Sequence, residues 1–524
     1  MSKRTKYILT GAAAFVVLVV AGAFFAASVI AKRFEPELRA QAIKYMQDRF
    51  HSKVEIGSLH INRPRMSTIQ ILLRHGRGAI VTVESEGITM RFGGDSSRPP
   101  MFAIKKLFFT VDLEVLVAPQ KSVNFVSIDG MEINIPPKDE RPSLQEPDGG
   151  EEKSSSAIAF QNVQIRDAVL TLLPKDAGKP PLRFHIARLH LQSVGSNSAS
   201  RYDADLTIPK PPGTIKSSGN FGPWDASTPG DTPLKGNYTF DNADLGIFKG
   251  IAGTLSSKGT FDGALDSINV RGTTYVPNFQ LKMAGNAVPL STTFEALVDG
   301  SNGNTVLQPV RATLGHTNFT TAGAVIKNDQ YSKRSITLEV TMPNGSMHDL
   351  LLLAMKGPPF MEGMIKMQSS IDIPPLNSTV KQKLVLDGTF ELHDAKFLKS
   401  AIQDQIDQLS RRGQGQPKNQ QIDQVISAMQ GSFHLENQLM TFRSLAFEVP
   451  GADVSVAGNY DMAADMLDFH GAVKLDAKLS QTMTGWKHWL LKPADPFFAK
   501  NGAGTFVKIK IEGSSHQPKF GLDR

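Results

Sequence analysis

The sequence predicts a mainly β protein behind an N-terminal transmembrane helix. Residues Tyr7 to Ala31 form one uncharged apolar run, and from Lys53 onward apolar and polar residues alternate over many short segments. A short phrase also recurs: glycine, then Asn, Thr or Ser, then an aromatic residue. It begins at Gly219, Gly236, Gly259, Gly388, Gly431, Gly458 and Gly504. The irregular spacing indicates a degenerate repeat of strand-opening units.

The apolar run is long enough to cross a bilayer. At about 1.5 Å of helical rise per residue it reaches roughly 37 Å, against a hydrocarbon core of about 30 Å. Three basic residues precede it, whereas Lys32 and Arg33 behind it are offset by Glu35 and Glu37. This bias favours a single span with a cytoplasmic N-terminus, and we assign residues 1–33 to the anchor and its flanks. A cleaved signal peptide is the alternative, although its apolar core is normally shorter.

Residues 34–136 are predicted to form a first lobe of one amphipathic helix followed by strands. Apolar residues between Phe34 and Phe50 lie near helical spacing. The clearest strand is Leu107 to Val117, in which every second residue is apolar and faces one side. Those residues are Leu107, Phe109, Val111, Leu113, Val115 and Val117.

Residues 137–156 are rich in proline, serine and acids, which predicts a flexible linker. Behind it, 157–524 is predicted to be a second, strand-rich region in which another phrase recurs at Asp167-Ala168, Asn242-Ala243 and Asp394-Ala395. Helical spacing predicts a short helix over 347–355 and a helical hairpin near 395–430, with one helix on each side of a glycine-containing turn.

The closing strands return to clean alternation, with Val473, Leu475 and Leu479 on one face of the first and Val507, Ile509 and Ile511 on one face of the last. Between them lie Trp486, Trp489, Phe497 and Phe498. Such a cluster is typical either of a membrane or partner interface or of a short helix that packs over the end of a core.

The catalytic inventory is small. The chain has no cysteine, and its 12 histidines form no metal-binding spacing. Ser378 and Lys381 match a Ser-x-x-Lys motif, but no companion motif accompanies them. The net charge of +7 is dispersed rather than gathered on one face, which argues against nucleic-acid binding. We therefore expect no enzyme activity, no metal and no cofactor.

The apolar sheet face remains as the candidate functional feature. An apolar face left in water forfeits about 25 cal/mol per Å², so it must be covered. A closed sandwich would cover it with a second sheet. The alternative is a curled sheet whose interior holds acyl chains, with Leu107 to Val117 and the closing strands as groove candidates.

Several segments, in order, resemble the AsmA-like family of bacterial envelope proteins. They are Lys32 to Pro36, Arg49-Phe50, Val54 to Leu59, Ser127 to Ile133, Gly504 to Phe506, Ile511 to Gly513 and Pro518 to Gly521. The first of these resemble the chorein-like N-terminus, and the last the family's C-terminal region. The resemblance covers most of the chain.

This resemblance implies an elongated, curled antiparallel sheet with a β-groove. It also implies an inner-membrane anchor, a periplasmic bulk, a role in envelope or outer-membrane biogenesis, and membrane phospholipids as the bound partners. Larger family members are much longer than this chain, so an envelope protein partner or self-association would complete a route across the periplasm. The other functional hypothesis is a non-catalytic envelope scaffold or assembly factor with closed β-domains that bind a protein.

Overall fold

The computed structural model describes residues 39–523, apart from 41, 45, 48–51, 63, 65, 67–69, 71–73, 75–76, 93–98, 113–121, 137–158, 175–179, 196–198, 224–227, 329–332, 399, 417–424, 478–504 and 516. The predicted transmembrane segment 7–31 and the predicted linker 137–156 lie outside these residues. No helix within the described part of the chain has the length and apolar character needed to cross a membrane.

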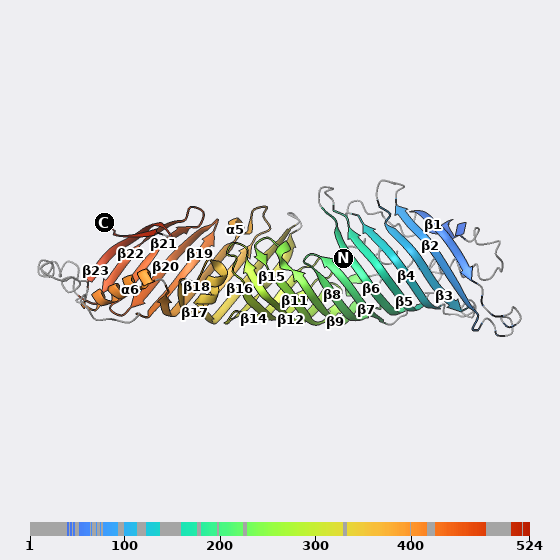
Figure 1. Ribbon diagram of the computed structural model, residues 1–524, viewed down its shortest axis with the longest axis horizontal. Coiled ribbons are helices and arrows are strands. Elements are labelled where there is room, and N and C mark those ends of the chain that lie inside the picture. Colours follow the sequence, from blue (N-terminus) through green and yellow to red (C-terminus); the bar gives the residue numbers. More distant parts are fainter. Residues whose placement is uncertain are drawn as a thin grey trace. The chain divides into compact units, whose positions relative to one another are not determined.

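The described residues are mainly strand, as the alternation predicts, and 24 strands hydrogen-bond into one sheet (Figure 1). The sheet is open, because β1 pairs only with β2 and β24 only with β23 among the described strands. The chain divides into two compact units. The first holds residues 1–244, 256–271 and 298–302, and the second holds 245–255, 272–297 and 303–524.

The strands of the first unit follow one another along the sheet. They are β1 (Ser52–Asn62), β2 (Ile80–Phe92), β3 (Phe102–Asp112), β4 (Ser122–Ile135), β5 (Ala159–Leu172), β6 (Leu182–Val194), β7 (Ser200–Pro209), β8 (Pro212–Phe221) and β9 (Pro233–Asp244), with η3 (Pro229–Asp231) before β9 and most of β11 (Thr254–Ala264) beside it. The apolar faces of β1 to β5 form one packed core, which includes Met46 from the helical residues 39–47.

One pair departs from the predicted antiparallel order. Strands β4 and β5 run parallel, with Val126 beside Val163 and Ile128 beside Ile165. Two neighbouring parallel strands need a long crossover connection, because the chain must return to the end of the sheet at which the first strand began. Residues 136–158 make that connection, so the strands on both sides of the predicted linker are direct neighbours. The linker itself stays a prediction.

The strands of the second unit pair antiparallel. They are β10 (Ile251–Ala252), most of β12 (Ser267–Leu281), β13 (Val288–Val298), β14 (Thr305–Leu314), β15 (Thr317–Asn328), β16 (Lys333–Ser346), β17 (Met361–Ile373), β18 (Val385–Phe397), β19 (Ser427–Glu436), β20 (Leu439–Val449), β21 (Ala452–Asp461), β22 (Met466–Leu475), β23 (Thr505–Ser514) and β24 (Gln517–Leu522). The described helices here are short: η4 (Leu245–Ile247), α4 (Met347–Ala354), α5 (Val380–Lys383) and α6 (Ser400–Gly413).

The helix predicted over 347–355 is confirmed as α4, but the predicted helical hairpin near 395–430 is wrong in its second half. Residues 400–413 are helical, whereas Ser427 onward is strand β19. Met429 pairs with Leu392 of β18. Pairing with β18 satisfies the backbone of this segment and buries every second side chain, which overrides its helical spacing.

The recurring Asp-Ala or Asn-Ala phrase marks a bend inside a strand. Asp167, Asn242 and Asp394 all have left-handed backbones, with φ of 53°, 56° and 53°. Asp and Asn tolerate this conformation better than other non-glycine residues. The alanine that follows is buried at each site, and a larger side chain has no room there. At Asp394 the register between β18 and β19 shifts, as in a β-bulge, and bulges bend a sheet.

Candidate functional site

The apolar face of the second unit is built from residues that lie in rows across eight consecutive strands, β16 to β23. The Leu338 row contains Leu338, Ile371, Leu386, Leu435, Met440, Tyr460, Leu467 and Gly513, each paired with the next. At about 4.8 Å between strands, the seven intervals extend roughly 34 Å. Most members are half-buried.

Three further rows run beside the first. The Val340 row contains Val340, Ser369, Gly388, Phe433, Phe442, Gly458, Phe469 and Ile511. The Met342 row contains Met342, Met367, Phe390, Gly431, Leu445, Val456, Gly471 and Ile509. The Ile365 row contains Ile365, Leu392, Met429, Phe447, Val454, Val473 and Val507.

Every member of the four rows except Ser369 is apolar, aromatic or glycine. The opposite face of the same strands is polar. Gln368, Thr389 and Ser432 pair across β17, β18 and β19, and Lys366 forms an ion pair with Glu391 at 3.1 Å. A shift of one residue in any strand would exchange the two faces, so the register itself keeps the apolar face continuous.

The glycine–aromatic phrase has a structural reason in these rows. Gly388 lies opposite Phe433, and Phe390 lies opposite Gly431, so each phrase covers the glycine of the other. The two phenyl rings are 6.4 Å apart between centroids. A Cβ added at Gly431 would lie 3.1 Å from the Phe390 ring. Rings that cover glycines in this way stabilise a strand and leave a shallow apolar wall.

The same arrangement surrounds Gly458. Its neighbours are Phe442 on β20 and Phe469 on β22, whose rings lie 5.7 Å apart between centroids. The glycine of the phrase, which has no side chain, therefore lies beside an aromatic ring on the neighbouring strand. Sequence reasoning detected the phrase but not this pairing, because the register is not visible in the sequence.

Two helices pack over part of this face. Helix α4 packs Met347, Leu350 and Leu351 against a cluster around Met342, Ile365 and Leu392. Helix α6 packs Ile406 against a cluster that includes Val449 and Leu475. Neither cluster contains a member of the Leu338 row or the Val340 row, so these two rows are the parts of the face that the described helices leave uncovered.

The predicted groove residues near the chain end come together on this face. Val473 pairs with Val507, and Leu475 pairs with Thr505. Ile509 and Ile511 continue the Met342 and Val340 rows. Leu475 belongs to the α6 cluster, and Val473 packs against that cluster although it is also a member of the Ile365 row. Val507 belongs to the Ile365 row as well. Leu479 lies outside the described residues. Their contact with lipid stays a prediction.

The other predicted groove residues occupy a different environment. Leu107, Phe109 and Val111 point into the core of the first unit, and their exposed fractions are 1%, 0% and 5%. Little of their surface is open to a ligand in this conformation. Leu113, Val115 and Val117 lie outside the described residues, as do Trp486, Trp489, Phe497 and Phe498.

In the first unit, strands β7 to β9 carry a face that mixes apolar groups with hydroxyls. Tyr202 bonds to the hydroxyl of Ser217 at 3.0 Å, and Tyr238 bonds to that of Ser257 at 3.1 Å. Burial raises the pKa of both tyrosines above the usual value, so both remain neutral donors at physiological pH.

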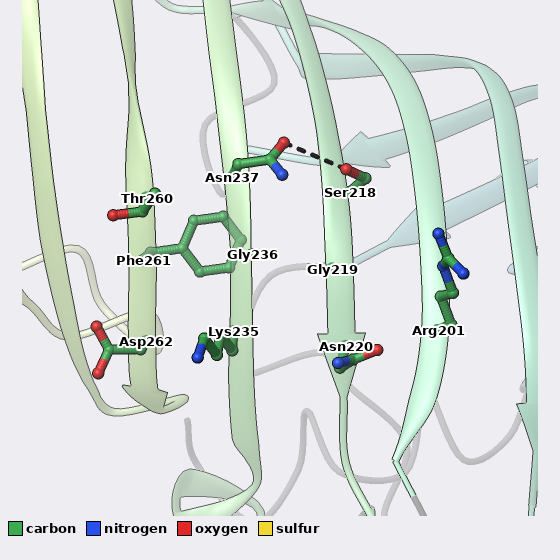
Figure 2. A pocket seen from close by; sticks show the side chains of 10 residues that line it. All are labelled: Arg201, Ser218, Gly219, Asn220, Lys235, Gly236, Asn237, Thr260, Phe261 and Asp262. Atoms are coloured by element: carbon green, nitrogen blue, oxygen red, sulfur yellow. Dashed lines mark hydrogen bonds between the residues drawn. The ribbon is translucent and has the colours of Figure 1, made fainter.

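A hollow of about 610 Å³ lies over β7, β8, β9 and β11 of the first unit (Figure 2). Arg201, Asn220 and Lys235 are register partners across three strands and share one face. Ser218 donates to the Asn237 side chain at 3.2 Å in the next row. The hollow is therefore polar and is distinct from the apolar rows of the second unit.

Within the described ranges, no group of three or more His, Asp or Glu side chains is placed to hold a metal ion. Ser378 precedes α5, where Thr379 caps the helix by accepting from the Gln382 backbone. The described apolar rows are thus the feature with the clearest binding chemistry. No protein-family model, curated protein or solved structure matches this chain.

Proposed function

We propose that this protein binds the acyl chains of membrane phospholipids along its Leu338 and Val340 rows, as a membrane-anchored component of envelope biogenesis. Acyl chains need a long apolar surface and no catalytic group. The Leu338 and Val340 rows supply such a surface over eight strands. This continuity, outside both helix-packed clusters, is the observation that carries the proposal.

Covering this surface lowers the free energy, because it removes apolar area from water. Each 100 Å² of apolar area removed from water contributes about 2.5 kcal/mol. A lipid chain supplies this cover without fixed side-chain complementarity, because the shallow wall of rings and glycines offers no deep pocket for a specific group. A chain lying across successive strands would contact the same kind of residue at each step.

The resemblance to the AsmA-like family supports the same function and extends it. On that basis we propose an inner-membrane anchor at residues 7–31, a periplasmic location for the strands, and a role in moving phospholipids along the sheet. A protein partner or a second copy would extend the path.

The packed core of β1 to β5 favours the alternative hypothesis for that part of the chain. Its side chains fill the space between β1 to β5 and residues 39–47, as expected of a scaffold domain that binds a protein partner. This core and the apolar rows use the same alternating pattern, so a direct search for lipid is needed to separate the hypotheses.

The test uses the full-length chain extracted from membranes in a mild detergent. Native mass spectrometry should detect co-purifying phospholipid. A phospholipid with a photoactivatable diazirine in its acyl chain should then label Leu338-row residues such as Ile371 and Met440, and spare Gln368 and Ser455 on the opposite face. A lipid-free protein, or equal labelling of both faces, would refute the proposal and leave the scaffold hypothesis.

A further inference from the structure

Two lysines from different elements of the second unit lie close together where β16 begins, beyond the Leu338 row. Lys333 begins β16, and Lys383 ends α5 just before β18. The Nζ atoms of both donate to the carbonyl oxygen of Leu376, at 3.3 Å and 3.2 Å. Two positive charges are thus held near one acceptor.

A third lysine comes from the segment that contains η4 and β10. An added Cβ at Gly250 would lie 3.9 Å from Val380 of α5, which places this segment against α5. Lys249, next to Gly250, is close enough to Lys383 for their charges to repel. We call Lys249, Lys333 and Lys383 the lysine bridge.

The segment that contains η4 and β10 contacts elements at both ends of the strands. Strand β10 pairs with Leu281 at the end of β12, and Lys282 donates to the carbonyl oxygens of Gly246 and Phe248. Nearby, Asn286 donates to carbonyl oxygens at the end of α4, which follows β16. The η4 segment is therefore attached near the end of β12 and close to the end of β16. Its Gly250 nevertheless lies against α5, which is near the start of β16.

The lysine bridge concentrates positive charge. Burial lowers the pKa of Lys383, and the charges of Lys333 and Lys249 lower it further. Across the described residues, no carboxylate forms an ion pair with any of the three. An anionic ligand would relieve this repulsion, and an ammonium group binds phosphate oxygens as a compact charge with three donors.

Apolar groups flank these charges. Ile247 lies two residues before Lys249, and Leu376 supplies the carbonyl that the other two lysines contact; these apolar side chains are 47% and 43% exposed. Lys333 begins β16 on the polar side of the alternation, and its Nζ reaches the Leu376 carbonyl beyond the end of β17. The apolar side of the same strand carries Ile336, which pairs with Ile373, and then Leu338 of the first row. A ligand that carries both a phosphate and an acyl chain would place the phosphate at this strand end and the chain along the apolar face.

We propose that the lysine bridge binds the phosphate group of an amphiphile whose acyl chain lies on the Leu338 row. The proposal rests on the function proposed above and specifies where the headgroup lies. Because Lys333 and Lys383 lie where β16 and β18 begin, the bridge would also fix the end of the rows at which a bound headgroup stops.

The test compares three probes on the full-length chain in a neutral detergent by calorimetry: dihexanoyl phosphatidic acid, dihexanoylglycerol and inorganic phosphate. The double variant Lys333→Gln/Lys383→Gln should bind the phosphatidic acid at least about tenfold more weakly, which corresponds to about 1.4 kcal/mol. Its binding of dihexanoylglycerol, which lacks phosphate, should not change. The matched control Lys474→Gln/Lys508→Gln removes two exposed lysines from β22 and β23 and should bind all three probes normally.

The outcomes separate this inference from the function on which it rests. Equal binding of phosphatidic acid by the wild type and K333Q/K383Q overturns the lysine bridge while the acyl-chain function stands. Failure of both lipids to bind overturns both. Binding of inorganic phosphate as tight as that of the phosphatidic acid, and lost in K333Q/K383Q, supports a phosphate site but assigns it to a free anion. A thermal melt of each variant, matching the wild type, confirms that the fold is intact.

Discussion

A carboxylate placed within the Leu338 row should block acyl-chain binding without unfolding the protein. Ile371 is the site of choice, because it lies between Leu338 and Leu386 on a half-buried stretch. The variant Ile371→Asp forces a chain away from the row at this strand. A loss of about four CH₂ contacts at about 0.8 kcal/mol each is about 3 kcal/mol, or roughly a hundredfold in affinity.

The effect on stability should be smaller. A fully buried isoleucine contributes about 1.5–3 kcal/mol, so a half-buried one contributes about 1 kcal/mol, and the new carboxylate keeps access to water. The matched control is Gln368→Asp, which adds the same charge to the opposite face of the same strand. Binding of a fluorescent fatty-acyl phospholipid and urea unfolding are measured for both variants.

Two results would refute this reasoning. Normal lipid binding by I371D would show that no chain lies on the row. A loss of more than about 4 kcal/mol of unfolding free energy would show that Ile371 belongs to a dry core, because only a buried unpaired charge costs that much.

Three further predictions concern the fold. Phe109→Ala should cost about 3–5 kcal/mol of unfolding free energy in urea titrations, because a fully buried ring leaves a cavity. Asp349→Ala should cost about 1–3 kcal/mol, since the hydroxyl of buried Thr317 loses its acceptor at 2.9 Å. The hydrogen bond to Asp523 raises the pKa of His470 above 6.5, so its stabilisation of the chain end is present below about pH 6.5 and is lost as pH rises through the raised pKa. Hydrogen exchange of the β24 amides should therefore quicken, beyond its intrinsic pH dependence, between pH 5.5 and pH 8.5.

Each of these has a control on the same kind of element. Phe108→Ala, on the other face of β3, should cost clearly less than Phe109→Ala, and equal losses would contradict the core assignment. Asp404→Ala, at an exposed position of α6, should leave stability unchanged. His470→Ala should abolish the added pH dependence of β24, while His393→Ala should retain it; a pH response that survives in H470A would exclude the His470 contact as its cause.

The sequence predicted the strands and their faces, because alternation depends on neighbouring residues alone. Val473 and Val507 were placed on apolar faces correctly, and the register then made them direct partners. What the sequence did not show was the order of pairing. The parallel contact of β4 with β5 depends on a crossover whose return direction no local pattern specifies. The strand at Ser427 was mistaken for a helix because its apolar residues fit both periods until β18 supplies a partner.

The candidate site was predicted only in part, for a related reason. Alternation identifies an apolar face, but it does not tell whether that face is filled or open. Leu107 to Val111 and Val473 carry the same pattern, yet the former are packed inside a core and the latter is half-buried. The neighbouring strands and helices make this difference, and they are distant in the sequence.

The glycines make part of the apolar face of the second unit shallow. In the first core, large side chains such as Phe102 and Ile104 occupy the space above the sheet. In the rows, Gly388, Gly431 and Gly458 place no side chain there, and the aromatic partner lies over the gap. A close-packed interior needs this missing volume to be supplied from outside the sheet. A flexible acyl chain adapts to such a shallow surface more easily than a rigid protein surface does, and this favours lipid over a protein partner on the Leu338 and Val340 rows.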